Sequence, residues 1–314
     1  MFEFVFLGTS ASAPSVHRGL SAHLVKHNEH RFLIDCGEGT QRQILKSGLG
    51  FKRLNHILVT HGHLDHILGL AGLFSTLTRW ETLEDVEILA GRWTLERIDA
   101  LLYGVRVIPK GKESSVQVNL RAIEAGVIFK ADDFDISAFP VLHRGPDCFG
   151  FVFEEKAHRP FLVEKAEALG VPPGPLRREL VNGDPVTLEN GTIIRPEQVL
   201  GEPLAGAKLV HVGDTGSTAE ILAAARGADA LVIEATYLEA EREMAKEFAH
   251  LTARQAAELA GEAGVGQLLL THVSRRYRES DILAEAQAIF PKVAVARDFD
   301  VYQIKRGEVV KLEN

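Results

Sequence analysis

The chain has 314 residues, of which 46% are hydrophobic, and a formal net charge of -8 at pH 7. This length can bury a large core, in one big domain or two modest ones. No run approaches the roughly 18 apolar positions that a membrane span needs. The negative charge argues against indiscriminate nucleic-acid binding, which depends on a basic footprint. The amino terminus lacks the basic stretch of a signal peptide, so we expect a cytoplasmic protein.

Two cysteines, Cys36 and Cys148, are too few for a disulfide framework. Neither has a second cysteine at metal-binding spacing. Both are therefore predicted to be reduced and structural.

Short apolar runs alternate with amphipathic stretches, which predicts strands separated by helices. In the first half, strands are expected at 3–7, 22–26, 31–36, 57–60 and 86–90, and helices at 41–46, 67–77 and 94–102. Four strands without intervening helices follow, at 118–123, 127–130, 134–141 and 149–154. The alternation then resumes, with strands at 208–212, 231–234, 268–271 and 293–296 and helices at 219–225, 253–263 and 282–290. Two mixed sheets covered by helices fit this pattern best.

The segment 156–200 interrupts the alternation with several prolines and glycines and few apolar residues. In a compact domain such a segment is either a functional protrusion or a disordered insert. Taken alone, it is more simply interpreted as a solvated surface loop.

Three histidines and one aspartate follow a predicted strand directly, in the sequence Thr60-His61-Gly62-His63-Leu64-Asp65-His66. Because the next apolar residues recur at helical spacing, we expect these polar residues on the connecting turn. Residues two apart in a turn can converge, so His61 and His63 can hold one metal ion while Asp65 and His66 face a second. Zinc prefers such ligands, and manganese or iron tolerate them. The alternative, a loop of surface histidines, would rarely produce the full pattern.

Two ions need more ligands than one turn provides. His143, Asp214 and His272 each lie just past an apolar run. Their shared position favours ligands over a capping aspartate or a satisfied histidine at a strand end. A carboxylate has two oxygens, which makes Asp214 the natural shared ligand. His211 lies inside its predicted strand and is expected to be packed rather than ligating.

These features resemble the metallo-β-lactamase fold over nearly the whole chain and, within that superfamily, the RNase Z family of transfer RNA 3′ endonucleases. The narrower resemblance rests on four features: Phe6-Leu7-Gly8-Thr9 followed by Pro14; Asp35-Cys36-Gly37-Glu38-Gly39-Thr40-Gln41; His250-Leu251-Thr252; and Pro172-Pro173-Gly174-Pro175. One departure is Arg18-Gly19, where the family often has Arg-Asn. The resemblance implies an α/β fold, a four-layered αββα sandwich forming one domain over 1–314, with 156–200 as an inserted, protruding flexible arm.

The resemblance also implies two zinc ions per subunit, with manganese or iron as substitutes. It assigns His61, His63 and His143 to one ion, Asp65, His66 and His272 to the other, and Asp214 to both. It further implies that Asp65 accepts the proton of the attacking water.

Three other residues are candidates for supporting roles. His250 is the candidate proton donor to the leaving oxygen, because Thr252 and Gln255 indicate a capping box that places it just ahead of a helix. Glu234, at the end of a predicted strand, would orient His250, as the resemblance suggests. Asp35 is expected to accept a proton from a ligating imidazole, as carboxylates beside metal sites commonly do. For His250 and Glu234 a purely structural role is the alternative.

The partner implied by the resemblance is precursor transfer RNA, gripped by the arm. Arg177 and Arg178 would face phosphates, next to Gly174 and Pro175. Arg276 lies close to a candidate ligand, so phosphate positioning and a solvated charge are equally good interpretations. The resemblance also implies a homodimer in which the arm of one subunit serves the site of the other.

Two further functions stay open. A two-metal hydrolase of small phosphodiesters or other esters would use the same ligands. A non-catalytic RNA-binding member of the superfamily fits less well, because the ligand set is complete. The arm and the His250 motif favour a zinc-dependent endoribonuclease that removes the 3′ trailer, leaving a 3′-hydroxyl on the transfer RNA and a 5′-phosphate on the trailer.

Overall fold

The computed structural model describes residues 1–80, 83–104, 107–108 and 116–313. The chain divides into two compact units, of which the first comprises Met1–Glu154 and Ala207–Asn314. The second is Glu155–Gly206 and contains the predicted insert 156–200.

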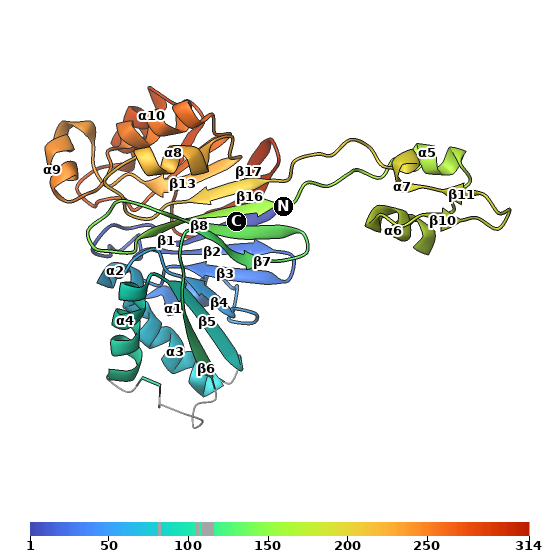
Figure 1. The fold of residues 1–314 in the computed structure, drawn as a ribbon. Coiled ribbons are helices and arrows are strands. Elements are labelled where there is room, and N and C mark those ends of the chain that lie inside the picture. The colour runs from blue at the N-terminus through green and yellow to red at the C-terminus, as the bar shows by residue number, and fades with distance from the viewer. Residues whose placement is uncertain (81–82, 105–106, 109–115, 314) are drawn as a thin grey trace. The chain divides into compact units, whose positions relative to one another are not determined.

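Two sheets form the centre of the first unit (Figure 1). The eight-stranded sheet has the order β17 (Glu308–Leu312), β16 (Val301–Lys305), β1 (Phe2–Gly8), β2 (Ala22–His27), β3 (His30–Ile34), β4 (His56–Leu58), β5 (Asp85–Ala90) and β6 (Gln117–Ala122). The seven-stranded sheet has the order β15 (Val293–Val295), β14 (Gln267–Thr271), β13 (Ala230–Glu234), β12 (Lys208–His211), β9 (Phe149–Glu155), β8 (Phe134–Pro140) and β7 (Gly126–Lys130). Both contain parallel and antiparallel pairs, so both sheets are mixed, as predicted.

Alternating side chains explain how the sheets pack. In β1, Phe2, Phe4 and Phe6 join the apolar layer between the two sheets. Val5 and Leu7, on the opposite face of the same strand, join the layer beneath the helices. A strand presents successive residues to opposite faces. Because β1 is apolar apart from Glu3 and Gly8, it is buried on both sides.

Helices cover the outer face of each sheet (Figure 1). On the eight-stranded sheet these are α1 (Thr40–Lys46), α3 (Gly69–Trp80) and α4 (Arg92–Asp99), which a π-helical turn at Ala100–Gly104 extends. On the seven-stranded sheet they are α8 (Ala219–Ala225), α10 (Ala253–Ala263) and α11 (Glu279–Gln287). The four αββα layers predicted from the sequence are confirmed.

Some elements of the first unit were not predicted. They include β16, β17 and α9 (Arg242–Glu247), together with the 3-10 turn at Glu239–Glu241 that precedes α9. Most residues of β17 are exposed at the sheet edge, which removes the apolar alternation by which a strand is recognised.

The second unit has more regular structure than its composition indicates. It contains α5 (Val163–Ala168), α6 (Pro175–Asn182), β10 (Val186–Thr187), β11 (Ile193–Ile194) and α7 (Pro196–Val199). A small core of its own is formed by Ala166, Val171, Leu180, Val186, Ile194 and Val199. These apolar residues are too widely spaced to predict an element, but folding brings them together.

Among the described residues, no helix combines the length and apolar character that crossing a bilayer requires.

Candidate metal centre

The predicted ligands lie just beyond the carboxyl ends of strands in both sheets. β3 and β4 run parallel, as do β12, β13 and β14. His61 follows β4, Asp214 follows β12 and His272 follows β14. Because parallel strands end at the same edge of a sheet, residues far apart in the sequence meet there.

The structure corrects one prediction about the histidine-rich segment. Asp65 and His66 lie within the short helix α2 (Leu64–Ile67), not on the turn before it, and only His63 has the extended backbone of a residue preceding a helix. His66 and Ile67 are both buried. This helical turn places polar residues of the site, not apolar ones, on its inner face. Hydrophobic periodicity therefore does not reveal that a helix begins here.

Seven side chains converge in two groups, and within each group the potential ligand atoms lie within 4.8 Å of one another. The first group is His61, His63, His143 and Asp214, and the second is Asp65, His66, Asp214 and His272. The structure therefore brings together every ligand candidate that the sequence indicated, in the same two sets.

Asp214 belongs to both groups because its two oxygens face different histidines. Its Oδ2 lies 3.7 Å from Nε2 of His61 and 3.7 Å from Nε2 of His143. Its Oδ1 lies 3.4 Å from Nε2 of His66 and 3.2 Å from Nε2 of His272. One carboxylate can in this way contact two cations.

Several buried polar atoms at this point lack a hydrogen-bond partner within the described part of the chain. They are His66 Nε2, His272 Nε2 and Asp214 Oδ1. Unsatisfied buried polar atoms are costly and rare in native proteins. Imidazole nitrogens and carboxylate oxygens are ligands for zinc and related divalent cations. The residues therefore fit divalent metal ions.

Asp35 holds one of these histidines from behind. Its Oδ2 lies 2.7 Å from Nδ1 of His66, as predicted, and both residues are fully buried. The backbone N–H of Thr60 donates to Asp35 Oδ1 at 2.8 Å. This partner leaves Nε2 of His66 directed at the metal position, since the other ring nitrogen is occupied.

Three more histidines have a similar outer contact. Nδ1 of His143 donates to the carbonyl of Ala249 at 2.8 Å. Nδ1 of His61 lies 3.0 Å from the hydroxyl of Thr60. Nδ1 of His272 lies 3.0 Å from the hydroxyl of Thr236. In each case Nε2 is the nitrogen left facing Asp214.

The charge states of His63 and Asp65 suit metal binding. Burial and the neighbouring His143 lower the pKa of His63 to about 4, so its ring is neutral at neutral pH. Burial alone would raise the pKa of Asp65, but the hydrogen bond and charge of His272 outweigh it and hold this pKa well below its usual range. Neutral imidazole and ionised carboxylate are the forms that bind metals. Burial lowers the pKa of His66, but the charges of Asp214 and Asp35 outweigh burial and raise it, so these carboxylates favour a positive charge at this position.

His250 and Glu234 form the predicted pair beside the two groups. Nδ1 of His250 lies 2.9 Å from Glu234 Oε1 and 3.1 Å from Oε2, and Glu234 is fully buried. Burial lowers the pKa of His250, but the charge of Glu234 and its hydrogen bond outweigh burial and raise this pKa to about 9. The capping box at Thr252 and Gln255, which starts α10, is present as predicted. At neutral pH the pair therefore carries a protonated imidazole.

Thr236 is a residue of the site that the sequence did not indicate. Its hydroxyl donates to Glu234 Oε2 at 2.5 Å and lies 3.0 Å from Nδ1 of His272. It thus connects the His250–Glu234 pair to a candidate ligand. Its position two residues after Glu234, on the same side of an extended chain, is the only signal that could have suggested it.

Four of the residues predicted to contact RNA lie in the second unit. Gly174 precedes α6 with φ 131, a backbone conformation that favours glycine, and Pro175 is the first residue of that helix. The guanidinium of Arg177 donates to the carbonyl of Val171 at 2.9 Å, and its side chain is 16% exposed. Arg177 is thus engaged within the unit, whereas Arg178 is exposed.

The fifth, Arg276, lies in the first unit. Its guanidinium pairs with Glu241 at 2.9 Å and contacts the sulfur of Met244 at 3.0 Å. About half of its side chain stays exposed, at 49%. The Arg276 guanidinium therefore has partners within the protein, while part of its side chain stays open to solvent.

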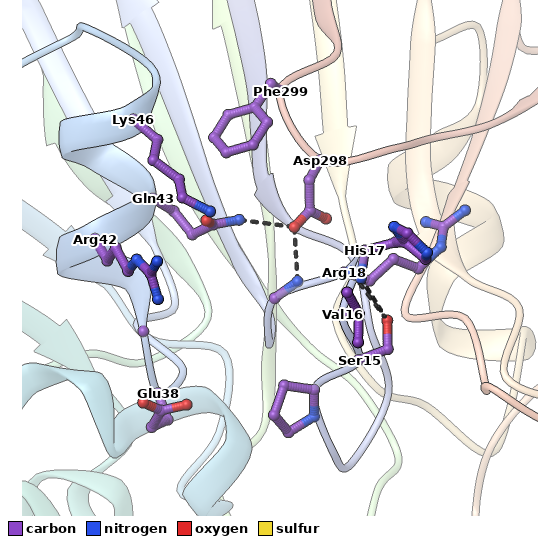
Figure 2. A pocket seen from close by; sticks show the side chains of 13 residues that line it. Ser15, Val16, His17, Arg18, Glu38, Arg42, Gln43, Lys46, Asp298 and Phe299 are labelled. Carbon is purple, nitrogen blue, oxygen red and sulfur yellow. Dashed lines mark hydrogen bonds between the residues drawn. The ribbon is translucent and has the colours of Figure 1, made fainter.

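The departure at Arg18-Gly19 lies beside a pocket of about 550 Å³. Asp298 accepts hydrogen bonds from the Gly19 backbone N–H at 2.6 Å and from the Gln43 side chain at 2.7 Å (Figure 2). Arg18 pairs with Glu279 at 2.9 Å. A Cβ added to Gly19 would lie 3.1 Å from Nε2 of Gln43, so a larger residue here would require the Gln43 side chain to shift.

Comparisons with known proteins identify the family to which the chain belongs. Residues 2–160 match the family model described as anti-Pycsar protein Apyc1, and residues 182–273 match the beta-lactamase superfamily domain. The chain is 48% identical over 300 residues to "Ribonuclease Z" of Bradyrhizobium diazoefficiens, covering 96% of this chain and 99% of that protein. It is 37% identical over 302 residues to "Ribonuclease Z" of Archaeoglobus fulgidus, covering 95% and 96%.

A solved structure supports the same relationship. The crystal structure of human tRNase Z, short form, aligns with a TM-score of 0.66 and 25% identity, over 96% of this chain and 98% of that one. Because the similarity to these proteins extends over almost the whole length of each, it includes the second unit as well as the metal centre. The chain therefore belongs to the ribonuclease Z family, within the metallo-β-lactamase superfamily.

Proposed function

We propose that this chain is an endoribonuclease that removes the 3′ trailer from precursor transfer RNA. One observation carries the proposal. In a member of the ribonuclease Z family, a single buried carboxylate, Asp214, faces two groups of ligands, and the His250–Glu234 pair lies beside them. This arrangement provides both a site for activating water and a donor for the leaving oxygen.

We assign one ion to His61, His63 and His143, the other to Asp65, His66 and His272, and Asp214 to both, with zinc as the cofactor. When bound, two such cations supply Lewis-acid activation of water and neutralise the charge of the phosphodiester. Asp65 is ionised and lies at the edge of the second group, with its Oδ2 3.6 Å from Nε2 of His272. Its carboxylate accepts the proton of the attacking water.

The reaction replaces one bond to phosphorus with another. The oxygen of water attacks phosphorus, and the bond between phosphorus and the 3′ oxygen of the upstream nucleotide breaks. The leaving oxygen takes a proton from His250, which Glu234 holds in position and in its charged form. The products are a 3′-hydroxyl on the transfer RNA and a 5′-phosphate on the trailer.

The second unit is proposed to be the arm that grips the body of the transfer RNA, inserted at 156–200 into a single domain spanning 1–314. Arg178 and the turn at Gly174 and Pro175 are exposed and available for phosphate contacts. We also propose, from the family resemblance, that the protein is a cytoplasmic homodimer. Sedimentation of the purified protein would test the dimer.

Cleavage of a defined substrate tests the function. The protein loaded with Zn²⁺ is incubated with a transfer RNA that carries a 3′ trailer, and both new ends are mapped. A single cut at the junction of transfer RNA and trailer, with a 3′-hydroxyl upstream and loss of activity after chelation, is the expected result. Activity on bis(p-nitrophenyl) phosphate without cleavage of the RNA would contradict the proposal and favour a hydrolase of small phosphodiesters.

Removal of the second unit tests whether this unit is needed for binding of precursor transfer RNA and not for phosphodiester hydrolysis itself. The chain enters and leaves this unit at adjacent points, since a Cβ added to Gly206 would lie 2.4 Å from Cβ of Glu155. A short glycine linker can therefore replace residues 156–205. The shortened protein should hydrolyse bis(p-nitrophenyl) phosphate at the rate of the full chain and lose cleavage of precursor transfer RNA. Equal loss of both activities would mean that the segment is needed for the fold.

A further inference from the structure

Trp93, on α4, packs against the turn that carries two candidate ligands. Gly62 lies between His61 and His63, and a Cβ added to it would lie 2.9 Å from Cζ3 of Trp93 and 3.1 Å from Cδ of Arg97. The space beside the turn is therefore already filled by these two side chains. The guanidinium carbon of Arg97 lies 4.9 Å from the centre of the indole ring, so the two side chains also hold each other.

The same indole reaches the loop that carries the third ligand of the first group. A Cβ added to Gly145, two residues after His143, would lie 3.3 Å from Cζ3 of Trp93. The amino end of α4 is docked on this loop too, because a Cβ added to Gly91 would lie 2.3 Å from Cβ of Asp147. Trp93 thus lies between the two loops that supply the histidines of the first group.

The helix that carries Trp93 is firmly anchored. Thr94, Leu95 and Ile98 are buried, and the latter two belong to the core under the eight-stranded sheet. Trp93 itself is half-buried. A side chain on such a helix can fix the position of a neighbouring turn.

His63 differs from the other candidate histidines in how its ring is held. It faces the site with Nδ1, which lies 3.0 Å from Nε2 of His61 and 3.2 Å from Nε2 of His143. Within the described residues, its outer nitrogen Nε2 has no hydrogen-bond partner, whereas the other four candidate histidines each have one behind the ring. Hydrogen bonding therefore does not orient the His63 ring from behind.

We infer that Trp93 is a positioning residue, which holds the turn at Gly62 so that His63 and His61 face the first metal ion. Packing of an indole performs here the task that hydrogen bonds perform for the other histidines. The inference deepens the proposed function and rests on it only for the assignment of the ligands.

Metal content and cobalt spectra test this role directly. Wild-type protein and Trp93→Ala are dialysed against Zn²⁺ buffered at graded free concentrations, and the bound metal is counted. Wild type should bind two equivalents, and Trp93→Ala should hold one of them about 10–100-fold more weakly, as removal of supporting partners typically does. The visible spectrum of bound Co²⁺ should change for that one equivalent alone. Trp80→Ala, at an exposed indole (54%) on α3, is the matched control and should match wild type.

Two further variants make the result independent of how well Trp93→Ala folds. Trp93→Phe retains an aromatic ring and should recover most of the affinity. Gly62→Ala should weaken the same equivalent, because its Cβ meets the indole, and should weaken it less when added to Trp93→Ala, where only the flexible Arg97 side chain still meets that Cβ. Circular dichroism and thermal unfolding of each metal-free variant report on the fold.

The outcomes distinguish this inference from the proposed function. If folded Trp93→Ala or Gly62→Ala binds two equivalents with wild-type affinity and an unchanged cobalt spectrum, Trp93 is not a positioning residue. If wild type itself binds no metal, the ligand assignment and the proposed function fail instead.

Discussion

The two groups of candidate ligands are held in different ways. In the second group, His66 is fully buried, and the buried carboxylate of Asp35 holds its ring at 2.7 Å. In the first group, His63 is half-buried and is supported by contact of its turn with Trp93. A hydrogen bond to a buried carboxylate fixes the direction and the tautomer of an imidazole, whereas packing fixes only its position.

This difference suggests a division within the site. In the second group, His66 is fixed by its hydrogen bond to a fully buried carboxylate. In the first group, His61 and His143 are likewise held by hydrogen bonds behind the ring, and His63 differs from both in relying on packing. Variants that remove both ions, neither ion or one ion should therefore be distinguishable by metal content.

The largest effect is expected at the residue that the two groups share. Asp214→Asn keeps the size of the side chain but removes its charge, so both ions should be lost together. Cleavage of precursor transfer RNA should fall by more than about 10³-fold, since the electrostatic stabilisation of the reaction is lost. Metal analysis with single-turnover cleavage checks this. Retention of one tightly bound ion would show that Asp214 serves only one group.

Removal of the proton donor should separate activity from metal content. His250→Ala should reduce cleavage of precursor transfer RNA by about 10²–10⁴-fold, because the leaving 3′ oxygen then lacks a proton donor. Both equivalents of metal should remain. Hydrolysis of bis(p-nitrophenyl) phosphate should be much less affected, because nitrophenolate leaves without protonation. An equal fall on both substrates would argue against this role of His250.

A substitution behind the second group should affect one ion. Asp35→Asn can retain the oxygen that accepts the Thr60 backbone N–H, at 2.8 Å in the wild type. It loses the oxygen that faces His66. The second ion should bind about 10–100-fold more weakly and the first should be unaffected. Dialysis against graded free Zn²⁺ measures both, and equal weakening of the two ions would mean that the groups are not held independently.

The convergence of the candidate ligands could be predicted from the sequence because the signals for them are local. Asp214 and His272 each lie just past a mostly apolar run that predicts a buried strand, and the histidine-rich segment has a distinctive spacing. Parallel strand ends then bring such residues to one edge without further information. The fold class follows from the same alternation of strands and helices.

Contacts between separate elements could not be predicted in this way. Trp93 meets the turn at Gly62, far earlier in the sequence, where α4 begins against the loop containing Asp147. Val171 and Val199 meet in the core of the second unit, although neither belongs to an apolar run. These contacts depend on tertiary packing, which no short stretch of sequence encodes.

The smallest effects are expected in the second unit, where two adjacent arginines should behave differently. Arg178→Ala removes an exposed charge and should weaken binding of precursor transfer RNA a few-fold, without changing metal content or stability. Arg177→Ala removes the bond to the Val171 carbonyl and should lower the free energy of unfolding of this unit by about 1–3 kcal/mol. Filter binding and hydrogen exchange at 163–199 measure the two effects. If Arg177→Ala weakens RNA binding without faster exchange, its guanidinium contacts the substrate after all.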